Sequence, residues 1–248
     1  MRAVLHSCYP TLVTRSLSEF PSRRVLAEEL RFNATPDKGD VSALLLRPAG
    51  ATHLLVLGHG ASTNMRHATL QAISDAMAEQ RIATFRYNFP YSENGTARNS
   101  TATCVETIRN AVRAAQRAAP DLTLLAGGHS FGGRMTTTAQ SEEPLENVTG
   151  LILFSFPLHL PGRPATTRAE HLAKIDIPML FLSGTRDELA TLDLLEPTLH
   201  ALGEKTTLHL LDTANHGYKV LKKTRQSAED VFTEMARVTR EWAERVPS

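Results

Sequence analysis

The chain has 248 residues, of which 42% are hydrophobic and 21% charged, a composition that can bury a large core within one α/β domain. Its formal net charge is +1, without a basic stripe or polybasic run, so we expect neither a nucleic acid nor an anionic membrane as partner. No apolar run approaches the ~18 residues that span a bilayer. The two cysteines, too few for a disulfide framework and without metal-ligand spacing, fit a reducing compartment and predict a cytoplasmic protein.

The N-terminal stretch has a biased composition. It contains Arg2, Arg15, Arg23 and Arg24 with several Ser and Thr, and no acidic residue precedes Glu19. That bias is typical of a transit peptide, but the apolar face is weak and no secretory hydrophobic region is visible. We therefore predict a flexible N-terminal extension over residues 1–24. No linker, repeat or second domain is evident, and this predicts a single domain over residues 25–248.

From residue 25 the chain alternates between strand and helix patterns. Residues 25–32 and 41–46 predict a hairpin of two antiparallel edge strands, broken by turn-forming residues. The pattern then predicts a strand at 53–58, a helix that ends near Gln80 and a strand at 82–87.

The rest of the chain continues this alternation. An amphipathic helix carries Cys104, Ile108 and Ala115 on one face and stops at Pro120, so Cys104 is expected in the core. Strands that alternate with helices imply a mainly parallel sheet with helices on both faces. The remaining predicted elements are strands at 122–126, 150–155, 179–183 and 207–211, an irregular connection at 156–178 with one helical turn near 168–173, and a closing helix with Ser227 as N-cap.

Residues 122–134 carry the main functional signal. An apolar strand runs without a linker into Gly128-His-Ser-Phe-Gly132, and helix-compatible residues follow from Arg134. A G-x-S-x-G motif between a strand and a helix is a nucleophile elbow, in which a strained serine aims its hydroxyl outward and glycines let the two elements approach closely. We predict that Ser130 is a nucleophile. A glycine-rich turn that only links two elements is the alternative.

A serine hydroxyl needs a base within hydrogen-bond reach and an acid that orients this base. In sheets with this elbow, the acid and then the histidine follow the nucleophile along the chain, on loops after later strands. Asp187 follows the strand at 179–183, and His216 follows the last strand; the other histidines precede Ser130 or lie within other elements. We predict Asp187 as the acid and His216 as the base. The alternatives are a helix cap or solvated carboxylate for Asp187 and a solvent-facing ring for His216.

Acyl transfer also needs hydrogen-bond donors for the negative charge that develops on the carbonyl oxygen. One predicted donor is the backbone N–H of Phe131, at the start of the helix after Ser130. The other is the backbone N–H of Ala61, in the loop after the strand at 53–58, with Ser62 as the alternative.

These motifs together resemble the α/β-hydrolase superfamily and, within it, the small dienelactone-hydrolase-like group. The resemblance rests on His59-Gly60, Phe89-Pro90-Tyr91, the glycine-rich segment around Ser130, residues 183–187 and Asn215-His216. It implies an α/β-hydrolase fold with a mostly parallel eight-stranded sheet, and ester or related acyl hydrolysis without a cofactor. No metal site is predicted, and the connection at 156–178 is too short for a large cap domain. Dienelactone hydrolases carry Cys at the nucleophile position, so activity on dienelactones is not implied.

Three side chains could hold a polar or anionic group of the substrate: Arg86, Tyr91 and Arg134. The alternative is packing for Tyr91 and surface ion pairs for the arginines.

The sequence thus predicts a serine hydrolase, a monomer or homodimer, that acts on a small-molecule substrate with a small to medium ester or thioester. An amidase or acyltransferase would use the same residues, and a binding or scaffold protein could keep the fold without the chemistry.

Overall fold

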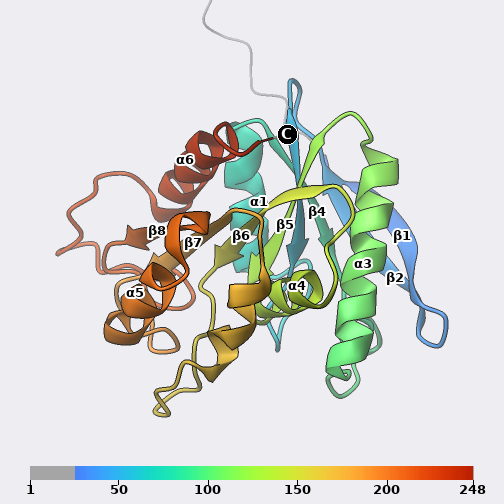
Figure 1. The fold of residues 1–248 in the computed structure, drawn as a ribbon. Helices are drawn as coiled ribbons and strands as arrows, with labels where there is room; N and C mark the ends of the chain where they lie inside the picture. The colour runs from blue at the N-terminus through green and yellow to red at the C-terminus, as the bar shows by residue number, and fades with distance from the viewer. Residues whose placement is uncertain (1–25, 248) are drawn as a thin grey trace, which may run out of the picture.

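Eight strands form one mixed sheet in the computed structural model, which describes residues 26–247 (Figure 1). Across the sheet they lie in the order β1-β2-β4-β3-β5-β6-β7-β8. The pairs β1/β2 and β2/β4 are antiparallel and all other neighbours are parallel, so the predicted mostly parallel, eight-stranded sheet is confirmed. The extension predicted at residues 1–24 lies outside the described residues. In chain order the strands are Glu28–Thr35 (β1), Gly39–Leu46 (β2), His53–Gly58 (β3), Ile82–Tyr87 (β4), Thr123–His129 (β5), Val148–Phe154 (β6), Met179–Gly184 (β7) and Thr206–Leu211 (β8).

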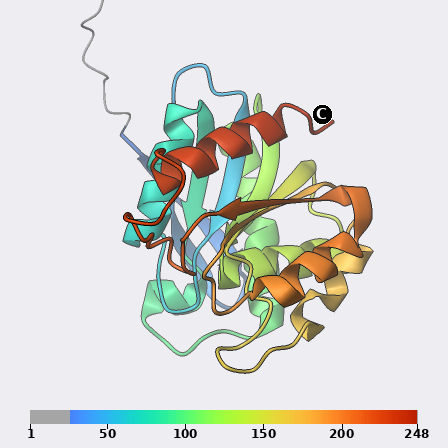
Figure 2. The same cartoon turned by 90° about the vertical axis from the view of Figure 1, so that its left-hand side faces the viewer.

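Helices cover both faces of this sheet. Helices α1 and α6 pack together on one face, and α3 and α4 pack together on the other, as the two perpendicular views show (Figures 1 and 2). The core is accordingly divided into two clusters of buried side chains, one on each face. The helices are Ala68–Glu79 (α1), Pro90–Asn94 (α2), Thr101–Ala118 (α3), Phe131–Glu142 (α4), Leu192–His200 (α5) and Val231–Ala243 (α6), with 3₁₀ helices at Thr167–Lys174 (η1) and Gly203–Lys205 (η2).

Double coverage explains the sequence of the central strands. The strands β4 and β7 are buried at every residue, and β3 is buried at all but its first, because helices pack against both of their faces. Cys104 of α3 is fully buried, as predicted, and burial raises the pKa of its thiol to about 11. Because these strands are buried, we expect the functional side chains on the loops at the ends of the strands.

The carboxyl ends of the parallel strands meet at one edge of the sheet. Gly58 at the end of β3 is paired with Gly128 of β5, and Gly184 at the end of β7 is paired with Leu211 of β8. The loops that follow these four strands therefore converge, which is the usual location of a site in an open α/β sheet.

Two predicted boundaries are wrong. The hairpin strands were expected at 25–32 and 41–46, but the first strand starts at Glu28 and runs on to Thr35, since the tight turn ends at Gly39 with φ +72°. The expected cap of the closing helix, Ser227, lies before the helix, and Asp230 caps it by accepting hydrogen bonds from the amides of Phe232 and Thr233.

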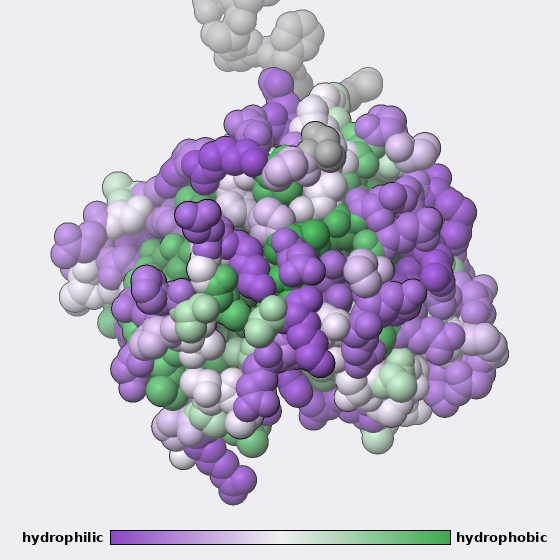
Figure 3. All heavy atoms as spheres, viewed as in Figure 1, coloured by the Kyte–Doolittle hydropathy of each residue, from purple (hydrophilic) through white to green (hydrophobic). Residues whose placement is uncertain are grey.

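The connection between β6 and β7 contains the predicted helical turn as η1, and no large cap domain occurs in residues 26–247. Hydrophilic residues cover most of the face that carries α3 and α4 (Figure 3). Within the same described range, no helix is long and apolar enough to cross a bilayer.

Candidate active site

The turn between β5 and α4 has the geometry of a nucleophile elbow. Ser130 has φ 52° and ψ −113°, a strained backbone for a residue with a side chain. The strain is held by the chain on both sides: the Ser130 amide donates to the carbonyl of Phe154 in β6 at 2.8 Å, and the Ser130 carbonyl accepts from the Arg134 amide at 3.0 Å. Ser130 thus stands at the N-terminus of α4 with its backbone fixed by neighbouring elements.

Glycines around the elbow are required by close backbone contact. A Cβ on Gly132 would lie 2.4 Å from the carbonyl group of Gly58 in β3, and one on Gly128 would lie 2.7 Å from the backbone of Gly132 and Gly133. No side chain fits at these distances without moving the backbone. The G-x-S-x-G pattern therefore brings α4 against β3 and β5, as the sequence predicted for this motif.

The hydroxyl of Ser130 faces a histidine and, beyond it, a carboxylate. The Oγ of Ser130 lies 2.8 Å from Nε2 of His216, and Nδ1 of His216 lies 2.9 and 3.0 Å from the two carboxylate oxygens of Asp187. The Asp187 side chain is fully buried, whereas that of His216 is 21% exposed. The structure thus brings together Ser130, Asp187 and His216, the three residues that their order along the chain predicts.

The loops after β7 and β8 hold each other in place. The amides of Thr185 and Arg186 donate to the carbonyls of Leu211 and Ala214 at 3.1 and 2.9 Å. The Asp187 carboxylate also accepts from the Leu189 amide at 2.9 Å. Because the backbone fixes the carboxylate, Asp187 can orient the His216 ring without itself being mobile.

The loop after β3 fixes the peptide between Gly60 and Ala61. The carbonyl of Gly60 accepts from the Thr63 amide at 3.2 Å, from the Thr63 hydroxyl at 3.1 Å and from Nδ1 of His59 at 2.8 Å. In a trans peptide the N–H points opposite to the carbonyl, so these bonds also set the direction of the Ala61 N–H. Neither the Ala61 amide nor the Phe131 amide donates to an acceptor within residues 26–247. Both are available to a ligand.

The two ring nitrogens of His59 both have backbone partners. Its Nδ1 donates to the Gly60 carbonyl, so the proton is on Nδ1, and its Nε2 accepts from the Phe89 amide at 3.2 Å. The side chain is fully buried, and burial lowers its pKa to about 4. His59 precedes the nucleophile along the chain, so its sequence position does not indicate a role in the site. Its contribution to the Ala61 loop depends on a contact that spans 30 residues.

His129 also precedes Ser130 along the chain, and it contacts the loop of the predicted base. Its Nε2 donates to the backbone carbonyl of His216 at 3.1 Å, and the two rings lie 5.5 Å apart. Burial lowers the pKa of His129 to about 4, so the ring is neutral near pH 7. The only feature of the sequence that indicates this contact is the position of His129 next to Ser130 in the elbow.

The three predicted substrate contacts have different surroundings. Tyr91 is buried, with its ring 6.3 Å from that of Phe131, and burial raises the pKa of its hydroxyl. Arg134 lies on the first turns of α4, and its Nε is buried without a protein partner in the described part of the chain. Arg86 is not brought to this group: its guanidinium donates to the Met65 carbonyl and to the Gln71 side chain of α1.

This arrangement has a definite chemical capacity. A neutral imidazole that touches a hydroxyl can accept its proton as the oxygen attacks a carbonyl, and a buried carboxylate stabilises the imidazolium that forms. A backbone amide without an acceptor, such as that of Phe131 at the start of α4, can stabilise an oxyanion. Within residues 26–247, no group of three His, Cys, Asp or Glu residues is arranged to hold a metal ion.

Many solved structures share this fold, among them the following three. A dienelactone hydrolase from Anabaena variabilis is 16% identical, with a TM-score of 0.69 over 90% of this chain and 99% of that chain. An α/β serine hydrolase without a lid from Xanthomonas campestris is 18% identical, with a TM-score of 0.67 over 92% of this chain and 98% of that chain. An esterase from Pyrococcus furiosus is 15% identical, with a TM-score of 0.68 over 94% and 97%.

At such low sequence identities, these structures show only that the fold is shared. The family is shown by a separate match of the sequence itself. Residues 51–244 match the family described as alpha/beta hydrolase domain. This range includes the loops that carry Ala61, Ser130, Asp187 and His216. The sheet order, the elbow after β5 and this match lead to one conclusion: the chain belongs to the α/β-hydrolase family.

Proposed function

We propose that the chain is a serine hydrolase that cleaves a small to medium ester or thioester through an acyl-enzyme on Ser130. The observation that carries this proposal is the 2.8 Å contact between Ser130 Oγ and His216 Nε2, continued by the contact of His216 with Asp187. A protein that kept only the fold would have no need for a strained serine and a buried acid joined by one histidine.

The proposed reaction has two halves. Ser130 Oγ attacks the carbonyl carbon while His216 takes the hydroxyl proton, and the amides of Phe131 and Ala61 stabilise the oxyanion. The bond to the leaving group breaks as His216 gives this proton to the departing oxygen or sulfur. Water then attacks the acyl-enzyme, loses a proton to His216 and releases the acid, and the proton returns to Ser130. The net change is hydrolysis of one ester or thioester.

Replacing the nucleophile tests the proposal. Ser130→Ala should lower the turnover of para-nitrophenyl butyrate by a factor on the order of 10⁶, as in comparable triads, because no oxygen remains to attack. The matched control is Ser141→Ala, at the other end of the same helix, where the hydroxyl donates to the Thr138 carbonyl; its turnover should equal that of the wild type. Full activity of folded Ser130→Ala would remove the assignment.

We also propose that the protein acts in the cytoplasm. The support is compositional: the sequence has only two cysteines, and Cys104, the one within the described residues, is a buried free thiol.

A further inference from the structure

Two arginines lie at the first turns of α4, where Ser130 stands, and a third lies in η1, which packs against α4. The guanidinium carbon of Arg98, in the loop between α2 and α3, lies 5.3 Å from the centroid of the Phe131 ring. Arg134 follows Ser130 by one helical turn. Arg168, in η1, donates to the His159 carbonyl at 3.1 Å. They come from three separate segments of the chain.

The helix geometry directs Arg134 toward the nucleophile. Residues four apart lie on one face of a helix, and each Cα–Cβ bond is tilted toward the N-terminus, so the side chain of Arg134 covers the turn that begins at Ser130. The Nε of Arg134 is buried and has no hydrogen-bond partner within the described residues. A buried donor without a partner costs free energy and is normally explained by a missing ligand or water.

Arg98 and Arg168 add positive charge around Arg134. The pKa of Arg134 is lowered first by burial and then by the charges of Arg168 and Arg98. No carboxylate of residues 26–247 forms an ion pair with any of the three; the ion pairs of this part of the chain involve other basic residues. The positive end of the α4 dipole adds to the same field. Three like charges without a counter-ion favour an anion at this place.

There is room for a ligand beside Arg98. A cleft of about 480 Å³ is lined by Arg98 and Tyr91 together with Ala61 and Ser62 of the loop after β3. The cleft therefore joins an arginine of this group to the amide proposed for the oxyanion. A molecule in this cleft lies against Arg98 and against the loop whose Ala61 amide is proposed for the oxyanion.

We propose that Arg98, Arg134 and Arg168 form an anion site next to Ser130, and that the preferred substrates are esters that carry a carboxylate. This inference rests on the proposed function, since it assigns the substrate class of the same site. Guanidinium groups bind carboxylates through paired, charge-assisted hydrogen bonds, and Arg134 supplies a donor that is otherwise unused. The bond cleaved and the proton transfers are those of the hydrolysis above.

A matched pair of substrates tests the preference. The mono-para-nitrophenyl ester of succinic acid carries a free carboxylate, and its methyl ester is the neutral counterpart with the same reacting bond. The wild type should turn over the charged ester with a kcat/KM at least about tenfold higher, because hydrogen bonds to charged groups are stronger than neutral ones. The advantage should shrink as salt is added, since the site is partly exposed. Equal kcat/KM values for the two esters would overturn the proposal.

Variants assign the preference to the arginines. Arg134→Gln should remove most of the advantage through a higher KM for the charged ester and leave the neutral ester within about twofold, while Arg134→Lys should keep part of it. The matched control is Arg117→Gln, an exposed arginine in the last turn of α3, which should change neither substrate. A parallel loss on both esters in Arg134→Gln would mean that Arg134 supports the elbow and does not bind an anion.

A binding measurement separates this inference from the proposed function. Succinate titrated into the Ser130→Ala variant by calorimetry should bind, and Arg134→Gln in the same background should weaken binding by about tenfold. If succinate binds and the wild type hydrolyses no ester, the anion site stands and the proposed function fails. If the wild type hydrolyses the neutral ester and succinate does not bind, the proposed function stands and the anion site fails.

Discussion

The neutral ring of His129 ties the elbow to the loop of the proposed base. Its Nε2 donates to the His216 carbonyl at 3.1 Å, so it fixes the backbone from which the His216 ring reaches Ser130. Within the elbow motif this position tolerates many residues, but here its side chain spans 87 residues of chain. Such a contact positions the base and takes no part in proton transfer.

We predict that His129→Ala lowers kcat by about 10- to 100-fold with little change in KM, because a misplaced base slows the chemical step. His129→Gln, whose amide nitrogen can occupy the place of Nε2, should keep most of the activity. Steady-state kinetics on para-nitrophenyl butyrate checks this, with circular dichroism to establish folding. Equal losses in the two variants would show that the hydrogen bond to His216 is not what matters.

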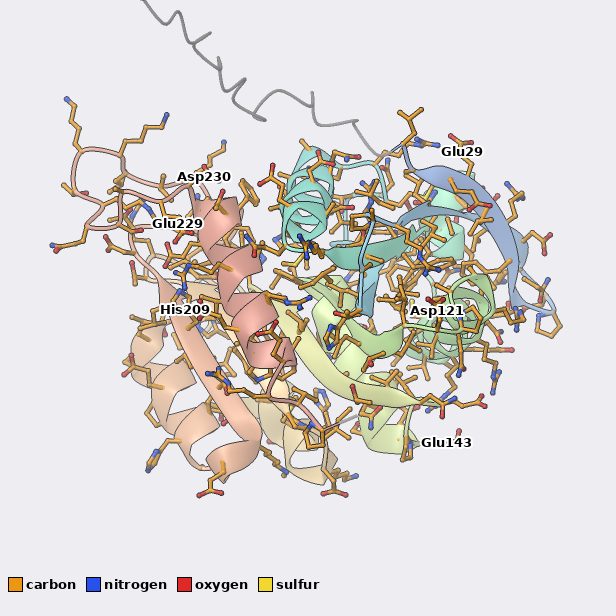
Figure 4. The ribbon with its side chains drawn as sticks, turned by 90° about the horizontal axis from the view of Figure 1, so that it is seen from above. Glu29, Asp121, Glu143, His209, Glu229 and Asp230 are labelled. Carbon is orange, nitrogen blue, oxygen red and sulfur yellow. The ribbon has the colours of Figure 1, made fainter. Side chains whose placement is uncertain are left out.

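A buried ion pair fastens the segment before α6 to the rest of the molecule. Arg225 pairs with Glu234 of α6, and both side chains are at most 10% exposed. Glu234 also contacts His209 of β8 at 2.8 Å, and Figure 4 shows His209 beside α6, with Glu229 and Asp230 at the start of the helix. These two contacts thus join the segment around Arg225, helix α6 and strand β8.

Removing one member of that pair should cost much more than removing an exposed pair. Glu234→Gln leaves Arg225 buried without its counter-charge, and we predict a loss of about 3–5 kcal/mol in the free energy of unfolding. The control on the same helix is Glu241→Gln, whose exposed pair with Arg237 should contribute under about 1 kcal/mol. Urea denaturation of both variants measures the difference, and similar losses would contradict this account of α6.

The elements that the sequence predicts well are those whose signals are local. The apolar run, the glycines and the following helix identify the elbow at Ser130 because all of its requirements lie within a few residues. The position of Arg86 could not be predicted from local signals. Every residue of β4 is buried, so the sequence has no polar alternation that shows which face of the sheet each side chain takes. The side of the sheet on which Arg86 lies is seen only from its contact with α1. Ser227 and Asp230 are both good caps, and the start of the apolar face of α6 selects Asp230.

At the scale of the whole molecule, buried neutral histidines make stability depend on pH. Burial lowers the pKa of His59 and of His129 from 6.5 to about 4. The unfolded chain then binds more protons than the folded one at mildly acidic pH, so the stabilisation is present above pH 6.5 and is lost as pH falls toward 4. Each histidine should contribute a loss of roughly 2 kcal/mol near pH 5.

We predict that the wild type loses several kcal/mol of unfolding free energy between about pH 7 and pH 5, and that His129→Gln loses about 2 kcal/mol less over the same range. Urea denaturation at the two pH values provides the comparison. An equal loss in the wild type and the variant would mean that His129 is protonated in the folded protein.

The proposed chemistry depends on Ser130 being the nucleophile. The most direct measurement is labelling of the folded wild type with a fluorophosphonate, followed by peptide mass spectrometry to locate the adduct. We predict a single adduct on Ser130, its loss in Ser130→Ala, and loss of ester turnover in step with labelling. An adduct on another residue, or a folded protein that hydrolyses esters while Ser130 stays unlabelled, would contradict it.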